Sequence, residues 1–254
     1  MERLFVTILV LLTSAAVVSA EEHTSTVEVS KNPTAVSILE HSLQRTFGTY
    51  AANSLRSIKG SGHVEYYSAG RSNAGELTLE SKPGEGIRLE STLEQGKRIL
   101  VISPTGSRVQ DINGLTHTLE PTALNVEKYV IPFLELSKAV SDESTSVLYA
   151  GLFEIEGKKF YRVHLQKVIK DRVNPNGDLS KLAAIDAFVD ADTSLLSAIQ
   201  GTTHTNGNLK DQYSETLYFW NYRLENGLLL PFTISARVGD QRVWEIQLQT
   251  ISMN

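Results

Sequence analysis

The apolar residues near the N-terminus follow a helical spacing. After a polar stretch over residues 21–31, apolar side chains recur at steps of three and four, which places them on one face of a helix. The members of this stripe are Val36, Leu39, Leu43, Phe47 and Tyr50. Asn32 and Pro33 come directly before the stripe and suit the N-cap and the first turn. We predict a helix from there to about Leu55, with Gly48 as a place where it can bend or end.

From Ile58 onward the apolar period changes from helical spacing to alternation. Leu77 and Leu79, for example, stand on either side of Thr78, as expected for a strand with one apolar and one polar face. The apolar residues that we assign to one continuous face are Leu77, Leu79, Ile87, Leu89 and Leu100. Turn residues such as those at 82–84 separate the runs. This pattern predicts about six antiparallel strands between residues 58 and 119.

A second helical stretch then interrupts the strands. Its apolar residues at helical spacing are Val126, Tyr129, Val130, Phe133 and Leu134. Pro121 can open this stretch, and Pro132 lies inside it, so the helix should break near Ile131. An apolar segment inserted between strands must cover an apolar surface, and we interpret residues 126–136 as a lid.

Alternation resumes after the polar segment 141–144 and continues to the end of the chain. It predicts about seven further strands, at residues 146–156, 158–169, 183–190, 194–203, 211–224, 228–238 and 242–252. Turn residues at 192–193 and 226–227 mark boundaries between several of these strands.

The elements together predict a mainly β (α+β) fold. We expect an unclosed antiparallel β-barrel of about 11–13 strands, with an N-terminal helix and a helical lid on its concave face. A sheet of that size twists and curls, and alternation makes its concave side apolar. Two helical segments then leave an apolar cavity, unless the sheet's own side chains fill it. The choice of concave face depends on the register, because a slip of one residue exchanges the two faces.

Composition excludes several classes of function. The chain has 24 Lys and Arg against 29 Asp and Glu, a net charge of −5, and no run of basic residues. Nucleic-acid binding is therefore not expected, since it needs a clustered positive face. The absence of cysteine rules out disulfides, thiolate metal sites and a cysteine nucleophile.

The first 20 residues have the features of an export signal. A short apolar run at residues 4–12 is followed by small residues up to Ala20. A membrane anchor is the alternative, but the apolar run, even when extended to Val18, has about 15 residues and is shorter than the roughly 20 needed to span a bilayer. We expect cleavage after Ala20, a single domain over residues 21–254, and a mature protein that is soluble outside the cytoplasm.

No catalytic or metal-binding pattern stands out. The six histidines are scattered, and no two lie at the spacing of metal ligands. Asp186, Asp190 and Asp192 raise the alternative of a cation site, although a strand face and a turn account for them. We therefore expect no catalytic residue, no metal and no cofactor. A hydrolase with dispersed serine and histidine residues stays a minor alternative.

The densest aromatic segment is at residues 218–222. Tyr218, Trp220 and Tyr222 share one face of the predicted strand. This segment is either a strand buried on both sides or a row of aromatic side chains that faces a ligand, and we include Trp220 among the candidate ligand-binding residues.

Several segments, in this order, resemble one known superfamily. They are GELTLESKP at 75–83 followed by IRLE at 87–90, GKRILV at 96–101, FVDADTSLL at 188–196, and GLLLPF at 227–232 followed by IQL at 246–248. Their content and order are similar to the LolA-like and LolB-like lipoprotein-sorting factors. The resemblance implies an unclosed β-barrel with a helical lid. Lys82 is a departure, because the carriers have there an arginine that contacts the lid.

The resemblance also implies a function. We expect a monomeric periplasmic carrier that shields the acyl chains of a lipoprotein or lipid in its half-barrel. The expected ligand-binding residues are Leu77, Leu79, Ile87, Leu89, Leu100, Val130, Phe133, Leu134 and Trp220. The alternative is an envelope-stress sensor of the same fold that binds a membrane protein partner.

Overall fold

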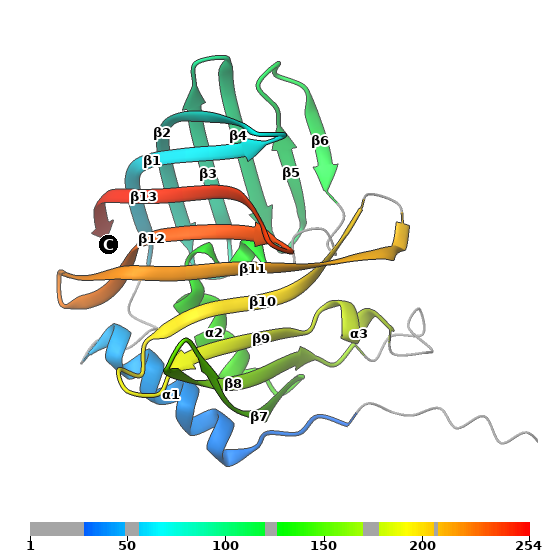
Figure 1. Ribbon diagram of the computed structural model, residues 1–254, viewed down its shortest axis with the longest axis vertical. Coiled ribbons are helices and arrows are strands. Elements are labelled where there is room, and N and C mark those ends of the chain that lie inside the picture. Colours follow the sequence, from blue (N-terminus) through cyan, green and yellow to red (C-terminus); the bar gives the residue numbers. More distant parts are fainter. Residues whose placement is uncertain (1–27, 49–55, 120–125, 170–177, 206–207) are drawn as a thin grey trace, which may run out of the picture.

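The computed structural model shows one large, strongly curved sheet with helices on one side (Figure 1). The structure describes residues 28–48, 56–119, 126–169, 178–205 and 208–254. In this part of the chain, 13 antiparallel strands form a single sheet in the order β6-β5-β4-β3-β2-β1-β13-β12-β11-β10-β9-β8-β7. The first strand pairs with the last, and β6 and β7 form the two free edges. The prediction of a mainly β, unclosed fold is confirmed.

The N-terminal half of the sheet contains the six strands that alternation predicts. They are β1 (Ile58–Ser68), β2 (Arg71–Lys82), β3 (Gly86–Leu93), β4 (Gly96–Ser103), β5 (Gly106–Gln110) and β6 (Thr116–Leu119). Each pairs with the next through a short turn. These strands form consecutive hairpins. A glycine at or near every turn can adopt the positive φ that the turn requires.

The C-terminal half contains seven strands. They are β7 (Thr145–Ile155), β8 (Lys158–Lys167), β9 (Ile185–Asp190), β10 (Leu196–Thr205), β11 (Asn208–Glu225), β12 (Leu228–Val238) and β13 (Gln241–Met253). All seven lie within a few residues of their predicted positions. The long strands β11, β12 and β13 connect the two halves of the sheet, since β13 pairs with both β12 and β1.

The predicted N-terminal helix is α1 (Pro33–Phe47). The Asn32 side chain caps it by accepting a hydrogen bond from the Ala35 backbone N–H at 3.1 Å. The helix ends at Gly48, whose φ of 58° suits glycine. The predicted continuation through Tyr50 to about residue 55 lies outside the described residues.

The second helical stretch is divided as predicted. A short 3₁₀ helix, η3 (Glu127–Val130), is followed by Ile131 in a non-helical conformation and then by α2 (Pro132–Ser141). Pro132 takes the first turn of α2, which explains the break. A third helix, α3 (Asp178–Leu182), was not expected from the sequence. Pro121, the proposed start of the stretch, lies outside the described residues.

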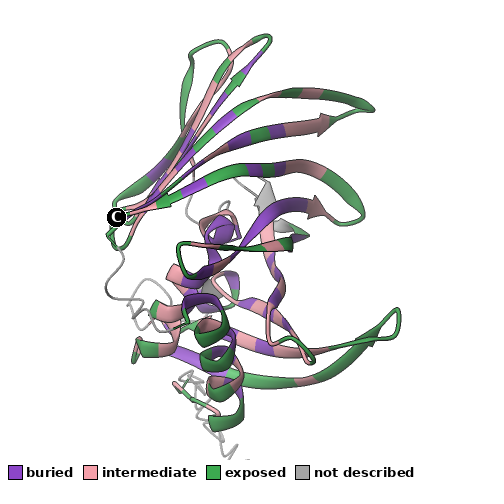
Figure 2. Cartoon of the chain, turned by 90° about the vertical axis from the view of Figure 1, so that its left-hand side faces the viewer, coloured by how far each residue is buried: buried purple, intermediate pink, exposed green. Residues whose placement is uncertain are grey.

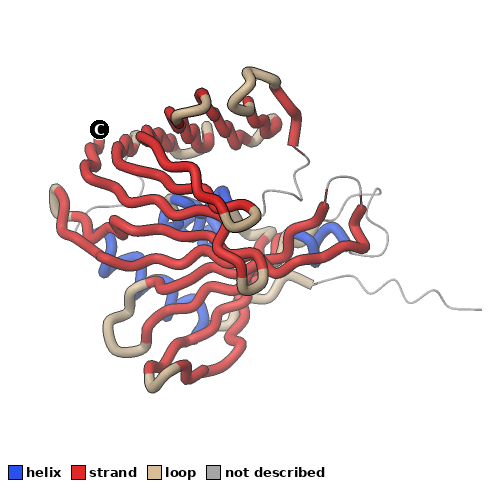
Figure 3. Tube along the Cα trace, turned by 45° about the horizontal axis from the view of Figure 1, so that its top comes forward, coloured by secondary structure: helices blue, strands red, loops and turns tan. Residues whose placement is uncertain are grey.

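The helices cover only part of the concave face. Helix α1 contacts α2 and the strands β7, β8, β9 and β12, while α2 contacts η3 and β7. The buried apolar residues of both sheet halves and of the helices form one core. Figures 2 and 3 show the strands of the N-terminal half extending beyond the helices, so that the sheet and the helices diverge on that side.

The proposed export signal, residues 1–20, lies outside the described residues. Among the helices of the described part, none has both the length and the apolar composition needed to cross a bilayer.

Candidate functional site

The predicted floor residues lie together on the concave face. In the strand register, Leu79 of β2 lies opposite Leu89 of β3, which lies opposite Leu100 of β4. Leu77 and Ile87 extend this apolar surface, and all five side chains are at most 5% exposed. The predicted register is therefore correct. The role of these residues in ligand binding stays a prediction, because this state of the protein buries them.

The three predicted lid residues differ in their contacts. Val130 is fully buried at the end of η3. Phe133 is also buried, and its ring meets the ring of Phe47 in α1 edge-on, with centroids 5.2 Å apart. Leu134, the next residue of α2, is half-buried and lines a cleft. Phe133 thus packs α2 against α1, whereas Leu134 lines the cleft.

This cleft lies between α2 and the ends of β2, β3 and β4. Its volume is ≈ 370 Å³, within the range of small-molecule binding sites. Ile87 and Ile102 line it from the sheet, and Ile131 and Leu134 line it from the lid. The cleft therefore opens directly beside the buried apolar floor.

The prediction for Trp220 is corrected by the structure. Trp220 is 40% exposed, whereas its neighbour Phe219 is buried in the core. Because successive residues of a strand point to opposite faces, Phe219 faces the concave side and Trp220 the convex side. Leu217 is buried on the same side as Phe219. Tyr218 is also exposed, so this strand is not buried on both sides either.

Two buried carboxyl groups in the core were missed by the sequence analysis. Glu215 of β11 is only 3% exposed, and Glu127 of η3 has a buried Oε2 with no hydrogen-bond partner among the described residues. Burial and, to a smaller extent, repulsion from the nearby Glu127 together raise the pKa of Glu215 to about 9. Burial also raises the pKa of Glu127, to about 7 after a backbone hydrogen bond and the positive charge of Arg98 have partly opposed the shift.

The sequence does contain a signal for Glu215. It precedes Leu217 and Phe219 at steps of two, and therefore occupies an inward position of β11. Inward polar positions on an otherwise apolar face are candidates for shifted pKa values. A pKa of about 9 means that Glu215 holds its proton at neutral pH.

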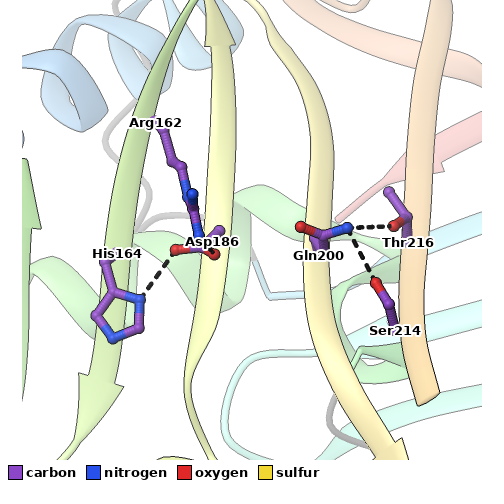
Figure 4. Close-up of polar contacts among 6 residues, drawn as sticks. All are labelled: Arg162, His164, Asp186, Gln200, Ser214 and Thr216. Atoms are coloured by element: carbon purple, nitrogen blue, oxygen red, sulfur yellow. Dashed lines mark hydrogen bonds and ion pairs between the residues drawn. The ribbon is translucent and has the colours of Figure 1, made fainter. Parts of the chain in front are cut away.

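A polar cluster occupies the convex face of β8 to β11 (Figure 4). Asp186 accepts hydrogen bonds from Arg162 Nη2 at 2.5 Å and His164 Nδ1 at 2.9 Å. Burial raises the pKa of Asp186, but these two hydrogen bonds lower it more, and the carboxylate stays ionised. Gln200 of β10 donates to the hydroxyl groups of Ser214 and Thr216 on β11.

These contacts account for two of the three proposed cation ligands. Asp186 is paired with Arg162 and His164, and Asp190 Oδ1 accepts the backbone N–H groups of Asp192 and Thr193 in a turn. In the described part of the chain, no group of three histidine or acidic side chains is placed to hold a metal ion.

The overall fold is shared with known structures. No family model matches the sequence, and no curated protein matches it. A LolA superfamily protein from Nitrosomonas europaea is 11% identical, with a TM-score of 0.54 over 87% of this chain and 93% of that chain. The chain has a LolA-like fold.

Two further structures show the same LolA-like fold. A domain from Vibrio parahaemolyticus, described as an outer membrane lipoprotein-sorting protein, is 10% identical, with a TM-score of 0.53 over 86% of this chain and 92% of that one. A DUF1329 family protein from Desulfovibrio piger is also 10% identical, with a TM-score of 0.56 over 87% and 92% of the two chains. At this identity the likeness concerns the fold alone.

Lys82 has a particular place in this LolA-like fold. It lines the cleft together with residues of η3 and α2. Its Nζ forms an ion pair with Glu85 of the same turn at 3.1 Å. Lys82 therefore takes part in a local ion pair at the rim of the cleft.

Proposed function

We propose that this protein binds the acyl chain of a lipoprotein or lipid in the cleft and carries it in shielded form. The observation that carries the proposal is the continuity of apolar surface from Ile102 and Leu134 in the cleft to the buried floor at Leu89. Burial of a 16-carbon chain contributes roughly 12 kcal/mol before the ordering costs are subtracted. Useful affinity thus requires no catalytic residue and no metal.

Ligand entry requires the lid to move. The floor leucines are covered in this state, and the cleft alone is too small for more than the outer part of a long chain. The non-helical conformation at Ile131 separates η3 from α2 and supplies a hinge between them. Movement of α2 away from β2 and β3 then extends the cleft along the floor.

The proposed setting is the bacterial periplasm. It rests on the export signal expected over residues 1–20 and on the lipoprotein-sorting description of one protein with this fold. We propose a monomeric, non-enzymatic carrier that needs no cofactor.

The test is native mass spectrometry of the full-length mature protein with a synthetic 16-carbon acylated peptide. The same peptide without its acyl chain is the matched control. Carrier function predicts a one-to-one complex with the acylated peptide only. Absence of a complex with either peptide, or equal binding of both, contradicts the proposal.

A second candidate function is the binding of a protein partner, and an exposed apolar strand favours it. Strand β7 is a free edge of the sheet, and several of its large apolar side chains are exposed. They are Leu148, Tyr149, Leu152, Phe153 and Ile155. Within the described residues only one bridge, from Lys31 to Val147, uses this edge. Such an edge can accept an added strand from a partner.

The two functions separate by mutation. Phe153→Lys on β7 is expected to abolish the binding of a partner protein of the cell envelope to this strand. Binding of the acylated peptide should stay unchanged. Loss of acyl binding in this variant contradicts the separation.

A further inference from the structure

The cleft has a charged side as well as an apolar one. Besides Ile87, Ile102, Ile131 and Leu134, four lysines line the same space. They are Lys82 from the β2–β3 turn, Lys128 from η3, Lys138 from α2 and Lys167 from β8. One acidic side chain, Glu135, lines the cleft with them. These five residues give the cleft a formal charge of about +3 at neutral pH.

Only two of the four lysines have an ion-pair partner. Lys82 pairs with Glu85 at 3.1 Å, and Lys167 approaches Asp142 at 3.8 Å. Lys128 and Lys138 form no ion pair with any residue that the structure describes. The ammonium group of Lys128 instead lies 5.1 Å from the centre of the Tyr129 ring.

The environment of Lys128 is unfavourable for a positive charge. Burial lowers the pKa of Lys128, and repulsion from Lys167 and Lys138 lowers it further, while Glu135 opposes the shift. A buried charge without a full counter-charge reduces stability, and an anion placed between these lysines would relieve that cost. The lysine cluster is thus incomplete without a negative partner.

We propose that this cluster binds the phosphate of an anionic lipid head group whose acyl chain enters beside Ile87 and Leu134. The inference rests on the proposed acyl-binding function and specifies its ligand as an anionic amphiphile. Lysine suits this role because its ammonium group binds phosphate as a point charge and tolerates several head-group geometries. The apolar and charged sides of one cleft match the two ends of such a molecule.

The test compares two 16-carbon lysophospholipids that differ only in the head group. Binding of lysophosphatidic acid and lysophosphatidylcholine is measured by isothermal titration calorimetry, below their critical micelle concentrations, at low salt. We expect the anionic lipid to bind about tenfold more tightly, from two partly buried charge pairs. This preference should shrink at high salt.

Substitutions in the lysine cluster test which residues cause the head-group preference. Lys128→Gln combined with Lys138→Gln should abolish the head-group preference while binding of lysophosphatidylcholine is retained. Lys158→Gln is the matched control, because Lys158 is an exposed lysine at the start of β8 and does not line the cleft. A preference that survives in the double variant overturns the assignment.

The outcomes distinguish this inference from the carrier proposal. Equal affinity of the wild type for both lipids overturns the head-group site alone, and no binding of either lipid overturns the carrier proposal as well. Glycerol 3-phosphate carries the phosphate without an acyl chain. If it binds as tightly as lysophosphatidic acid, the site is one for free phosphate, and the assignment to a lipid is overturned.

Discussion

The buried carboxyl group of Glu215 makes stability depend on pH. Its folded pKa of about 9 lies above the unfolded value near 4.5, so the folded protein keeps a proton that the unfolded chain releases. Its contribution to stability is complete below about pH 4.5 and is lost as the pH rises toward 9. The slope over this window is at most about 1.4 kcal/mol per pH unit.

Glu215→Gln should therefore raise the free energy of unfolding at pH 8 and flatten its decline between pH 5 and 8. Urea unfolding at several pH values measures both effects. Glu94→Gln is the control, because Glu94 is exposed. Parallel pH profiles for wild type and Glu215→Gln would show that Glu215 is ionised in the folded state.

Asn32, the N-cap of α1, is a second residue whose effect on stability follows from one contact. Asn32 accepts the Ala35 N–H through its side chain, and its own backbone N–H donates to the Val147 carbonyl at 2.8 Å. Asn32→Ala removes only the first bond and should lower the free energy of unfolding by about 1 kcal/mol. Asn32→Asp should restore most of this loss. An Ala variant as stable as the wild type in urea unfolding contradicts the role of the cap.

At the scale of elements, two adjacent residues of α2 should behave differently. Phe133 packs against Phe47, so Phe133→Ala should lower the free energy of unfolding by about 3 kcal/mol or more. Leu134 lines the cleft and is half-buried, so Leu134→Gln should weaken acyl binding about tenfold with little change in stability.

Calorimetric titration with the acylated peptide and urea unfolding measure these two effects. Leu224→Gln is the control, since Leu224 is 71% exposed at the end of β11. If Phe133→Ala weakens binding while stability is unchanged, the assignment of the two residues is reversed.

The elements themselves were largely predictable from the sequence. Alternation at Leu77 and Leu79 gave the correct face, and Pro132 gave the break in the lid, because both patterns reflect local geometry. Trp220 was predicted on the ligand-facing side because it belongs to an aromatic segment. The structure instead buries Phe219, so the inward face of β11 carries Phe219 and the outward face carries Trp220. The lysine side of the cleft was not predictable, because it joins residues from β2, η3, α2 and β8 that only the tertiary fold brings together.

At the scale of the molecule, the closure of the sheet predicts cooperative unfolding. Strand β1 pairs with β13 over nine residue pairs, and β13 also pairs with β12, so the N-terminal strands are completed by the C-terminal end of the chain. A single core continues through both halves and the helices. Neither half can therefore bury its apolar face alone, and we expect one unfolding transition.

Two probes in different places test this expectation. Trp220 and Trp244 report by fluorescence on β11 and β13 at the centre of the sheet, while far-ultraviolet circular dichroism reports on all the strands and helices. Their urea midpoints should coincide. A ligand of the folded state at 100 times its Kd should then raise the free energy of unfolding by about 2.7 kcal/mol in both signals. A circular dichroism signal that changes first, while the tryptophans keep their native emission, would show that the lid and the outer strands unfold separately. The cleft would then open by local unfolding rather than by movement of a folded α2.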